Sequence, residues 1–382
     1  MTAIRTTHAG SLPRAPELVE LLADLSRGRP VEAAQLAELV DTAVADVVAA
    51  QQAAGIDIVN DGEQSRESFF TYVQHRMTGF GPGDRRARAW RDFADFPGFI
   101  EQLRAQRPAT ASVNLGRPAQ AIGPVAYGDS AEIDADIARI RRHTDGREFA
   151  DVFMTAPSPG IVIAAMANQH YATDGEYLTA VGEALAVEYR RIAEAGMLLQ
   201  IDAPDLAMEA HCSFGDRPLD EFLVFVRDVI ATINTAVDGI DPERIRLHVC
   251  WGNYDGPHNH DIALAELLPF LYDTRVGGLL ISGANPRHAH EYREFERSPL
   301  PAGWTLCTGV IETTTNYVEH PEVVAERIER VAAAVGDPSR VIASTDCGFD
   351  TSAGFGAVAP DIAWAKLAVL SEGAALASSR LF

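Results

Sequence analysis

Three residues in this chain combine the side-chain types and the spacing of a metal-ligand set. His248 and Cys250 lie two positions apart in the apolar run IRLHVC, and in a strand both side chains would point to the same side. Cys347 follows much later in the motif STDCGF, between an acidic residue and a glycine. One imidazole and two thiolates form a soft donor set that favours zinc.

The His-x-Cys pair alone is weak evidence for a metal, because free cysteine also packs readily in apolar cores. Cys347 strengthens the metal interpretation, since it also closes a β-rich run. Three protein ligands with an open fourth position are typical of a catalytic zinc site rather than a structural one. A substrate thiol entering that position would be deprotonated and would become a competent nucleophile as a zinc-bound thiolate.

The elements that must position these residues are short β-rich runs separated by helical stretches. This alternation predicts an α/β protein with a parallel sheet, and eight such units favour one closed (β/α)8 barrel over residues 1–382. In such barrels the polar motifs that end separate strands converge on one rim. The eight runs are residues 4–10, 56–60, 151–156, 197–202, 245–250, 278–282, 305–310 and 341–346.

Amphipathic helices are predicted over residues 176–195 and 320–335, and they serve as scaffold. The interval 62–150 is too long for one crossover, so we expect an insertion over the rim, with a hairpin near 118–128. Its RRARAWR stretch (85–91) is locally basic, which fits either a solvated helix face or an anion-binding patch.

Composition narrows the possible partners. The 382 residues carry a net charge of −22 with 54 acidic and 32 basic side chains, which disfavours nucleic acid and anionic membranes. No apolar run is long enough to span a bilayer and no signal-peptide core is present, so a cytoplasmic location is expected. Four cysteines are too few for a disulfide framework in a chain of this length.

Six motifs in order along the chain resemble the C-terminal catalytic barrel of cobalamin-independent methionine synthase and its stand-alone single-barrel relatives. The motifs are HAGSLPR (8–14), DGEQSRESFF (61–70), LQIDAPDLA (199–207), HVCWGN (248–253), GVIETTTNYVEHPE (309–322) and STDCGF (344–349). The resemblance implies a TIM barrel and an enzyme of the 5-methyltetrahydropteroyltriglutamate–homocysteine S-methyltransferase type, active in methionine biosynthesis.

The resemblance also implies roles for individual residues. His248, Cys250 and Cys347 would bind Zn²⁺ and form the catalytic centre. The amino-acid thiol substrate would be held by four residues: Gly10, Ser11, Glu63 and Asp202. The two carboxylates suit a substrate ammonium group, although Glu63 could instead cap a helix and Asp202 could brace the rim.

Three departures from the family pattern affect the site. Ser282 stands where the family has a glutamate that completes the zinc sphere, so water or a recruited group (Glu312, His258 or His260) would fill the fourth position. The stretch 155–160 lacks a clear counterpart of the aromatic residue that stacks on folate. The family's N-terminal barrel, which helps to hold the methyl donor, has no counterpart in the sequence.

Other conspicuous residues point to structural roles. Cys212 lacks an assignable activating partner, and Cys307 lies inside an apolar run, so both are expected to pack in the interior. His8 precedes the Gly-Ser turn and suits either a substrate contact or a structural hydrogen bond. His288 and His290 are expected at a helix start, on the surface or as caps.

The favoured function is zinc-dependent methyl transfer to homocysteine, with methyl-folate or methylcobalamin as the donor. An alternative within the same chemistry is alkylation of another thiol by an epoxide, as in the epoxyalkane:coenzyme M transferases, which Ser282 makes credible. Two further alternatives are a lyase of the uroporphyrinogen decarboxylase type and a non-catalytic binding module stabilised by zinc. The acidic rim motifs disfavour the lyase, and an incomplete ligand set disfavours the module.

Overall fold

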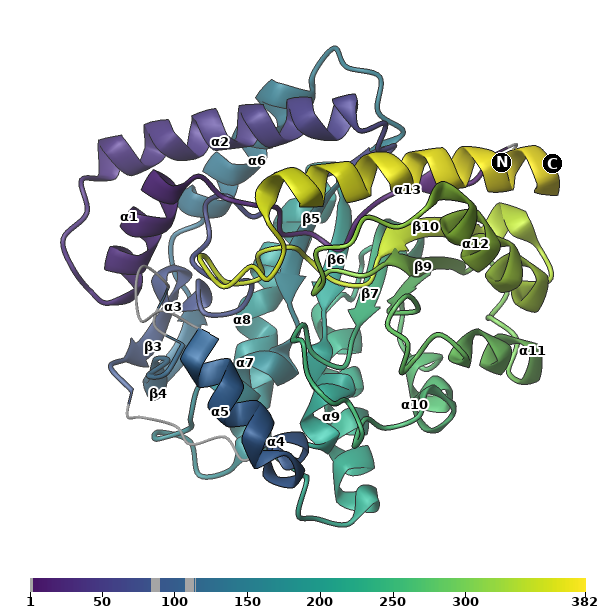
Figure 1. The fold of residues 1–382 in the computed structure, drawn as a ribbon. Helices are drawn as coiled ribbons and strands as arrows, with labels where there is room; N and C mark the ends of the chain where they lie inside the picture. Colours follow the sequence, from purple (N-terminus) through teal and green to yellow (C-terminus); the bar gives the residue numbers. More distant parts are fainter. Residues whose placement is uncertain (1–2, 84–89, 107–112, 114) are drawn as a thin grey trace.

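The computed structural model describes residues 3–83, 90–106, 113 and 115–382. Its centre is an eight-stranded parallel sheet with the order β1-β10-β9-β8-β7-β6-β5-β2 (Figure 1). The strands are β1 (Arg5–Thr6), β2 (Ile58–Val59), β5 (Asp151–Pro157), β6 (Leu198–Asp202), β7 (Ile245–Val249), β8 (Gly278–Ile281), β9 (Thr305–Ile311) and β10 (Val341–Thr345). Each of the eight predicted runs contributes one of these strands.

Side-chain hydrogen bonds connect the two ends of this strand order. The backbone N–H of Thr6 donates to Asp57 Oδ2 at 2.8 Å, and Thr7 Oγ1 donates to the carbonyl of Ile58 at 3.1 Å. These bonds join β1 to the start of β2, so the sheet curls into a nearly closed barrel. The predicted (β/α)8 fold is therefore confirmed.

Helices on the outside of the sheet cover its apolar strands. They include α1 (Pro16–Ser26), α2 (Ala33–Ala53), α7 (Pro159–Ala165), α8 (Asp174–Glu194), α9 (Leu219–Ala236), α10 (Leu264–Leu271), α11 (Glu294–Arg297), α12 (Pro321–Val335) and α13 (Pro360–Leu381). Two of them match the helices predicted from periodicity. Thr173 caps α8 through its side chain, whereas α12 has proline in its first turn and ends at Gly336 with φ 79°.

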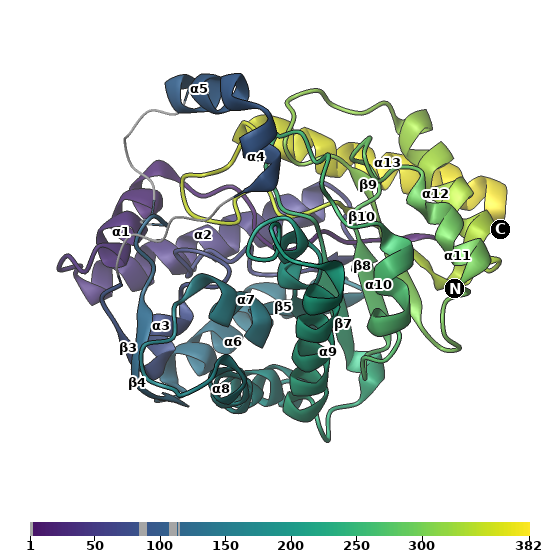
Figure 2. The same cartoon turned by 90° about the horizontal axis from the view of Figure 1, so that it is seen from below.

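Between β2 and β5 the chain forms elements outside the barrel sheet. They are α3 (Val73–Arg76), β3 (Met77–Gly81), α4 (Arg91–Asp95), α5 (Pro97–Gln106), β4 (Gln120–Tyr127) and α6 (Ala131–Thr144). Figure 2 shows α5 at the edge of the molecule, with α4 between it and the main body.

The predicted hairpin near 118–128 is wrong. Residues 120–127 continue as one strand, β4, which pairs antiparallel with β3. The irregularity lies in the partner strand, where the register shifts between Thr78 and Phe80 and Gly79 adopts φ 85°. Of the basic RRARAWR stretch, residues 85–89 lie outside the described residues.

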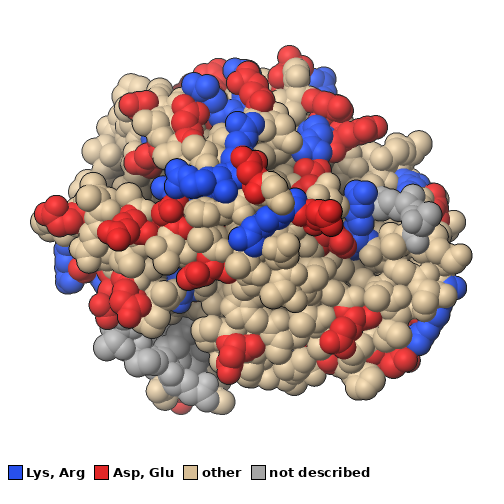
Figure 3. Space-filling model, turned by 90° about the horizontal axis from the view of Figure 1, so that it is seen from above, with Lys and Arg blue, Asp and Glu red and all other residues tan. Residues whose placement is uncertain are grey.

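The surface carries charges of both signs. On the face in Figure 3, acidic and basic side chains are interspersed across the upper half, without a broad basic area. Among the described residues, none of the helices has the length and apolar character needed to cross a membrane. The chain's one lysine, Lys366, is buried and lies 3.0 Å from Glu319, so it contributes to the interior and not to this surface.

Candidate metal and substrate site

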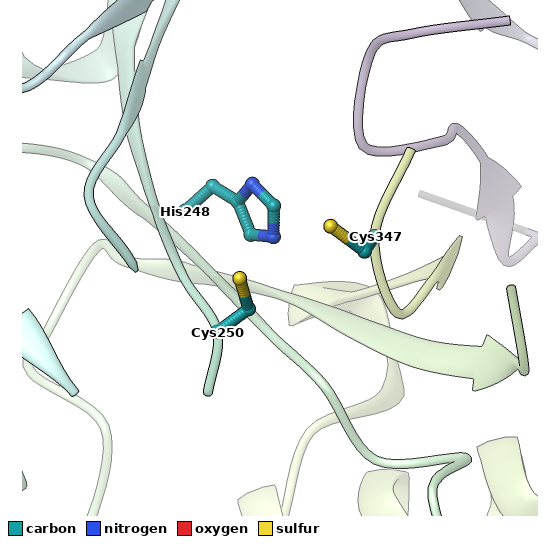
Figure 4. A group of neighbouring side chains, drawn as sticks. All are labelled: His248, Cys250 and Cys347. Carbon is teal, nitrogen blue, oxygen red and sulfur yellow. The ribbon is translucent and has the colours of Figure 1, made fainter. Parts of the chain in front are cut away.

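Two barrel strands that are far apart in the sequence bring a histidine and two cysteines together. His248 lies in β7, Cys250 follows that strand directly, and Cys347 follows β10. One ligand atom from each residue lies within 4.8 Å of the others, and all three residues are buried. Figure 4 shows both sulfur atoms facing the imidazole ring. The three residues form a group able to hold one metal ion.

The His248 ring is held in one orientation by Asp202 at the end of β6. Asp202 Oδ1 lies 2.8 Å from His248 Nδ1 and also accepts a hydrogen bond from Gln200 Nε2 at 2.7 Å. When the ring is neutral and Nδ1 donates to this carboxylate, the lone pair of His248 lies on Nε2. Nε2 is buried and has no hydrogen-bond partner among the described residues, so it is available to a metal.

The electrostatics of the three side chains are strongly linked. Burial lowers the pKa of His248, but the Asp202 carboxylate and the neighbouring Cys250 sulfur outweigh burial and raise that pKa to about 10. Contact with the Cys347 thiol lowers the pKa of Cys250 well below its usual value, and the same contact raises the pKa of Cys347. The site therefore favours a thiolate on Cys250.

A cavity of about 120 Å³ opens directly onto these residues. Its lining combines apolar side chains with carboxyl, hydroxyl and amide groups, a combination typical of small-molecule sites. Its lining includes Ser11, Glu63, Phe69, Phe70, Ile161, Asp202, Met208 and Asn253.

Glu63 offers an unused carboxylate oxygen to this cavity. Its Oε1 accepts a hydrogen bond from Thr155 Oγ1 at 2.9 Å, whereas the buried Oε2 has no hydrogen-bond partner within the described part of the chain. The backbone of Glu63 has φ 57°, which is unfavourable for a residue with a side chain. Burial, with a further contribution from Asp202, raises the pKa of Glu63 to about 7.

The Gly10–Ser11 turn approaches Glu63 and Cys347 closely. A Cβ atom on Gly10 would lie 2.7 Å from Glu63 Oε1, and Gly10 has φ 138°, so only glycine suits this position. A Cβ atom on Gly348 would lie 2.0 Å from Ser11 Oγ, so the turn also packs tightly against the Cys347 loop. Ser11 Oγ is buried and has no hydrogen-bond partner among the described residues.

The residues considered for a fourth ligand lie outside the three-residue group. Ser282 Oγ donates to the carbonyl of Asp346 at 3.0 Å and so ties the end of β8 to the Cys347 loop. Glu312 Oε1 accepts hydrogen bonds from its own loop, including the backbone N–H of Thr313 at 2.9 Å. His258 contacts Asp261 and His260 contacts Asp95, away from the two cysteines.

Asn253 is a site residue to which the sequence assigned no role. Its Nδ2 donates to the carbonyl of Gly348 at 2.8 Å, and its Oδ1 accepts from Thr313 Oγ1 at 3.0 Å. It therefore joins the loop of Cys250 to that of Cys347. The only signal in the sequence is its position, three residues after Cys250 in HVCWGN.

The remaining conspicuous residues stand apart from the cavity lining. Cys307 lies in the barrel interior near Arg246, and Cys212 is buried beside Ile161 and Met208, as expected for both. His8 Nε2 lies 2.8 Å from Gln51 Oε1, which favours its structural role. His288 is only 4% exposed, so the surface alternative is wrong for it, whereas His290 is exposed and lies at the N-cap of the short helix Glu291–Arg293, as expected.

Sequence comparisons match this chain to one protein family and to several methionine synthases. Residues 4–87 match the family described as "Cobalamin-independent synthase, Catalytic domain". A methionine synthase of Thermococcus kodakarensis is 26% identical over 348 residues, covering 90% of this chain and 86% of the relative. A methionine synthase of Sulfolobus acidocaldarius is 23% identical over 352 residues, covering 91% of this chain and 86% of the relative.

Solved structures show the same fold. A B12-independent methionine synthase from Shewanella sp. W3-18-1, in complex with selenomethionine, has a TM-score of 0.74 at 22% identity, with 99% of each chain covered. A putative vitamin-B12 independent methionine synthase from Listeria monocytogenes has a TM-score of 0.62 at 17% identity, covering 97% of this chain and 98% of the other. The sequence matches confirm the resemblance predicted from the motifs: the chain is similar to cobalamin-independent methionine synthases over most of its length.

Proposed function

We propose that this chain transfers a methyl group to the sulfur of homocysteine, with Zn²⁺ held by His248, Cys250 and Cys347. One imidazole and two thiolates are the donors that zinc prefers, and the unpartnered Nε2 of His248 fits such an ion. When bound, zinc would lower the pKa of a substrate thiol so that its thiolate is available at neutral pH. The relatives are named methionine synthases, which supports methyl transfer to homocysteine.

The observation that carries the proposed substrate is the pair of carboxylates in the cavity. Glu63 Oε2 is buried and has no partner among the described residues, and Asp202 contributes to raising the pKa of Glu63. Two acidic groups in one buried cavity favour a cation between them, and an ammonium group satisfies both. Ser11 Oγ would donate to the carboxylate of the same amino acid, which leaves its side-chain thiol directed at the metal ligands.

The remaining residues would orient and shield the reacting atoms. Asp202 fixes the His248 ring so that Nε2 faces the two sulfur atoms. Phe69, Phe70 and Met208 line the apolar side of the cavity and would exclude water from the thiolate. Since Phe69 and Phe70 lie within residues 62–150, we propose that this interval is a rim insertion of a single catalytic barrel and covers the substrate.

Alkylation of a thiol such as coenzyme M by an epoxide is the second candidate. Ser282 favours this second candidate, because it stands where the resembling family has a glutamate. Its hydroxyl donates a hydrogen bond to the carbonyl of Asp346. A sulfonate would face Glu63 and Asp202, however, and like charges in a buried site repel. The cavity lining contains these two carboxylates and, among the described residues, no arginine, which disfavours the decarboxylase alternative.

The decisive experiment compares thiols with and without an ammonium group. The zinc-loaded protein is assayed with homocysteine plus methyl-folate or methylcobalamin, and with coenzyme M plus an epoxide. Turnover of homocysteine is expected, and Glu63→Gln should raise its KM by about 10–100-fold, because a hydrogen bond to a charged group contributes about 1.5–3 kcal/mol. Glu17→Gln, on the surface of α1, is the matched control. Turnover confined to the coenzyme M assay would overturn the proposed substrate.

A further inference from the structure

A second group of potential ligands stands on the same rim, away from the cysteines. Asp92 lies in α4, His211 follows the short helix Met208–Ala210, and Asp261 precedes α10. One ligand atom from each lies within 4.8 Å of the others. Asp92 and His211 are 0% and 1% exposed. Three separate segments thus converge on one buried point that the proposed methyl transfer does not use.

His211 is the feature that the rest of the structure does not explain. Its ring is buried, yet neither nitrogen makes a hydrogen bond within the described residues. Nδ1 lies 3.2 Å from Asp261 Oδ1, an oxygen that also has no hydrogen bond there. Burying polar atoms without partners costs about 1–3 kcal/mol each, so such atoms usually face a ligand. Two ligands on one ion are also separated by about 3 Å when each metal bond is about 2.1 Å.

The other oxygen of Asp261 is held by two histidines that have no capacity left for an ion. Asp261 Oδ2 lies 2.7 Å from His258 Nδ1 and 2.8 Å from His288 Nε2. The second nitrogen of His258 lies 3.1 Å from the Tyr254 carbonyl, and that of His288 lies 2.8 Å from Glu291 Oε2. Both rings are therefore fully hydrogen-bonded, and they aim Asp261 Oδ1 at His211, as outer partners do for metal-binding carboxylates.

Asp92 is fixed in a comparable way. Its Oδ2 accepts a hydrogen bond from the Tyr254 hydroxyl at 2.6 Å, and its Oδ1 accepts from the backbone N–H of His260 at 3.1 Å. A carboxylate oxygen has more than one acceptor site, so each still has a lone pair for a cation. The Trp90 ring lies 5.7 Å from the His211 ring and shields this point from solvent.

The geometry points to a second divalent-cation site with Asp92, His211 and Asp261 as ligands. One imidazole and two carboxylates suit borderline or hard first-row ions such as Mn²⁺, Fe²⁺ or Zn²⁺ more than a thiol-seeking ion. A bound ion would tie α4, which belongs to the 62–150 interval, to the loops that follow β6 and β7. This inference does not depend on the methyl-transfer proposal.

Metal stoichiometry of the full chain tests the proposal. The protein is equilibrated separately with Zn²⁺ and Mn²⁺, freed of loose ions, and analysed for metal per chain. Loaded with Mn²⁺, which the two thiolates disfavour, wild type should hold one equivalent. Loaded with Zn²⁺, it should hold two. His211→Ala should lose one of them, Cys347→Ser should lose the other, and His290→Ala, a change at an exposed histidine, should keep both. If the metal content of His211→Ala were unchanged, the proposed second cation site would be refuted.

A second measurement applies whether or not the variants fold. Anomalous scattering from a Mn²⁺-soaked wild-type crystal should give a peak among Asp92, His211 and Asp261. A water molecule there instead, with no anomalous peak, would refute the proposal. A fourth variant, His258→Ala, separates the ligands from the residues that support them: it should weaken the affinity for the second metal ion by about 10–100-fold. Complete loss in His258→Ala but not in His211→Ala would overturn the assigned ligand set.

Discussion

The two ligand groups on the barrel rim differ in donor atoms and in surroundings. The first offers an imidazole and two thiols, and it opens onto the cavity lined by Glu63 and Asp202. The second offers an imidazole and two carboxylates, and none of its three residues lines that cavity. One rim can therefore support two kinds of site: a soft site exposed to substrate and a harder one enclosed by its own segments.

The largest expected effect separates the two groups. Cys347→Ser removes a soft ligand, so the first metal should be lost while the second remains. A catalytic metal stabilises the transition state by several kcal/mol. Turnover should therefore fall by about a hundredfold to a thousandfold when the metal is lost. Metal analysis and steady-state rates measure both effects.

Cys307→Ser is the matched control for this substitution. Cys307 is also buried but lies in the barrel interior near Arg246. The control should keep both metals and the wild-type rate. If Cys347→Ser also kept both, the cysteine pair would not form a metal site, and the contrast between the groups would collapse.

The next effect concerns the unpartnered carboxylate beside the first group. Burial raises the pKa of Glu63 from 4.5 to about 7, so the folded protein binds a proton there that the unfolded chain has released. The contribution of Glu63 to stability is therefore lost as pH rises from about 4.5 through 7. With chelator present, Glu63→Gln should become more stable than wild type by about 3 kcal/mol at pH 8, since one pKa unit is worth about 1.36 kcal/mol.

Urea unfolding at several pH values measures this difference. The gap between Glu63→Gln and wild type should be small at pH 4 and should widen towards pH 8. Glu17→Gln, at an exposed position of α1, should show no such widening. A gap that stays constant with pH would mean that the pKa of Glu63 is the same in the folded and unfolded protein. The carboxylate pair would then lose its argument for a bound cation.

The sequence predicted the first group and the barrel for the same physical reason. Alternating strand and helix periodicity located all eight strands, and parallel strands bring their carboxyl ends to one rim. Cys250 and Cys347 could therefore be placed near each other although they are far apart in the chain. The roles of Glu63 and Asp202 were predicted only from the resemblance that the ordered motifs carry, although each also follows or ends a barrel strand.

The second group could not be predicted in this way. Asp92 lies in a short helix between β2 and β5, where no barrel periodicity fixes its position. His211 and Asp261 lie in loops whose conformation depends on contacts such as that of Tyr254 with Asp92. The surface alternative for His288 was wrong for a related reason: its burial depends on Asp261 and on stacking against Trp251, with ring centroids 3.8 Å apart.

The smallest expected effect tests whether outer partners matter equally in the two groups. Asp202 holds His248 from outside the first group, as His258 holds Asp261 in the second. Asp202→Asn keeps the shape but weakens the bond that fixes the imidazole, so zinc affinity should fall by about 10–100-fold without loss of the fold. Competition with a chromophoric chelator measures the zinc affinity. Gln200→Glu changes the other hydrogen-bond partner of Asp202 and tests whether that contact also helps to hold the carboxylate in place. If zinc affinity were unchanged in Asp202→Asn, substrate binding would be the only role left for Asp202. Asp202 would then not support a metal ligand in the way that His258 supports Asp261.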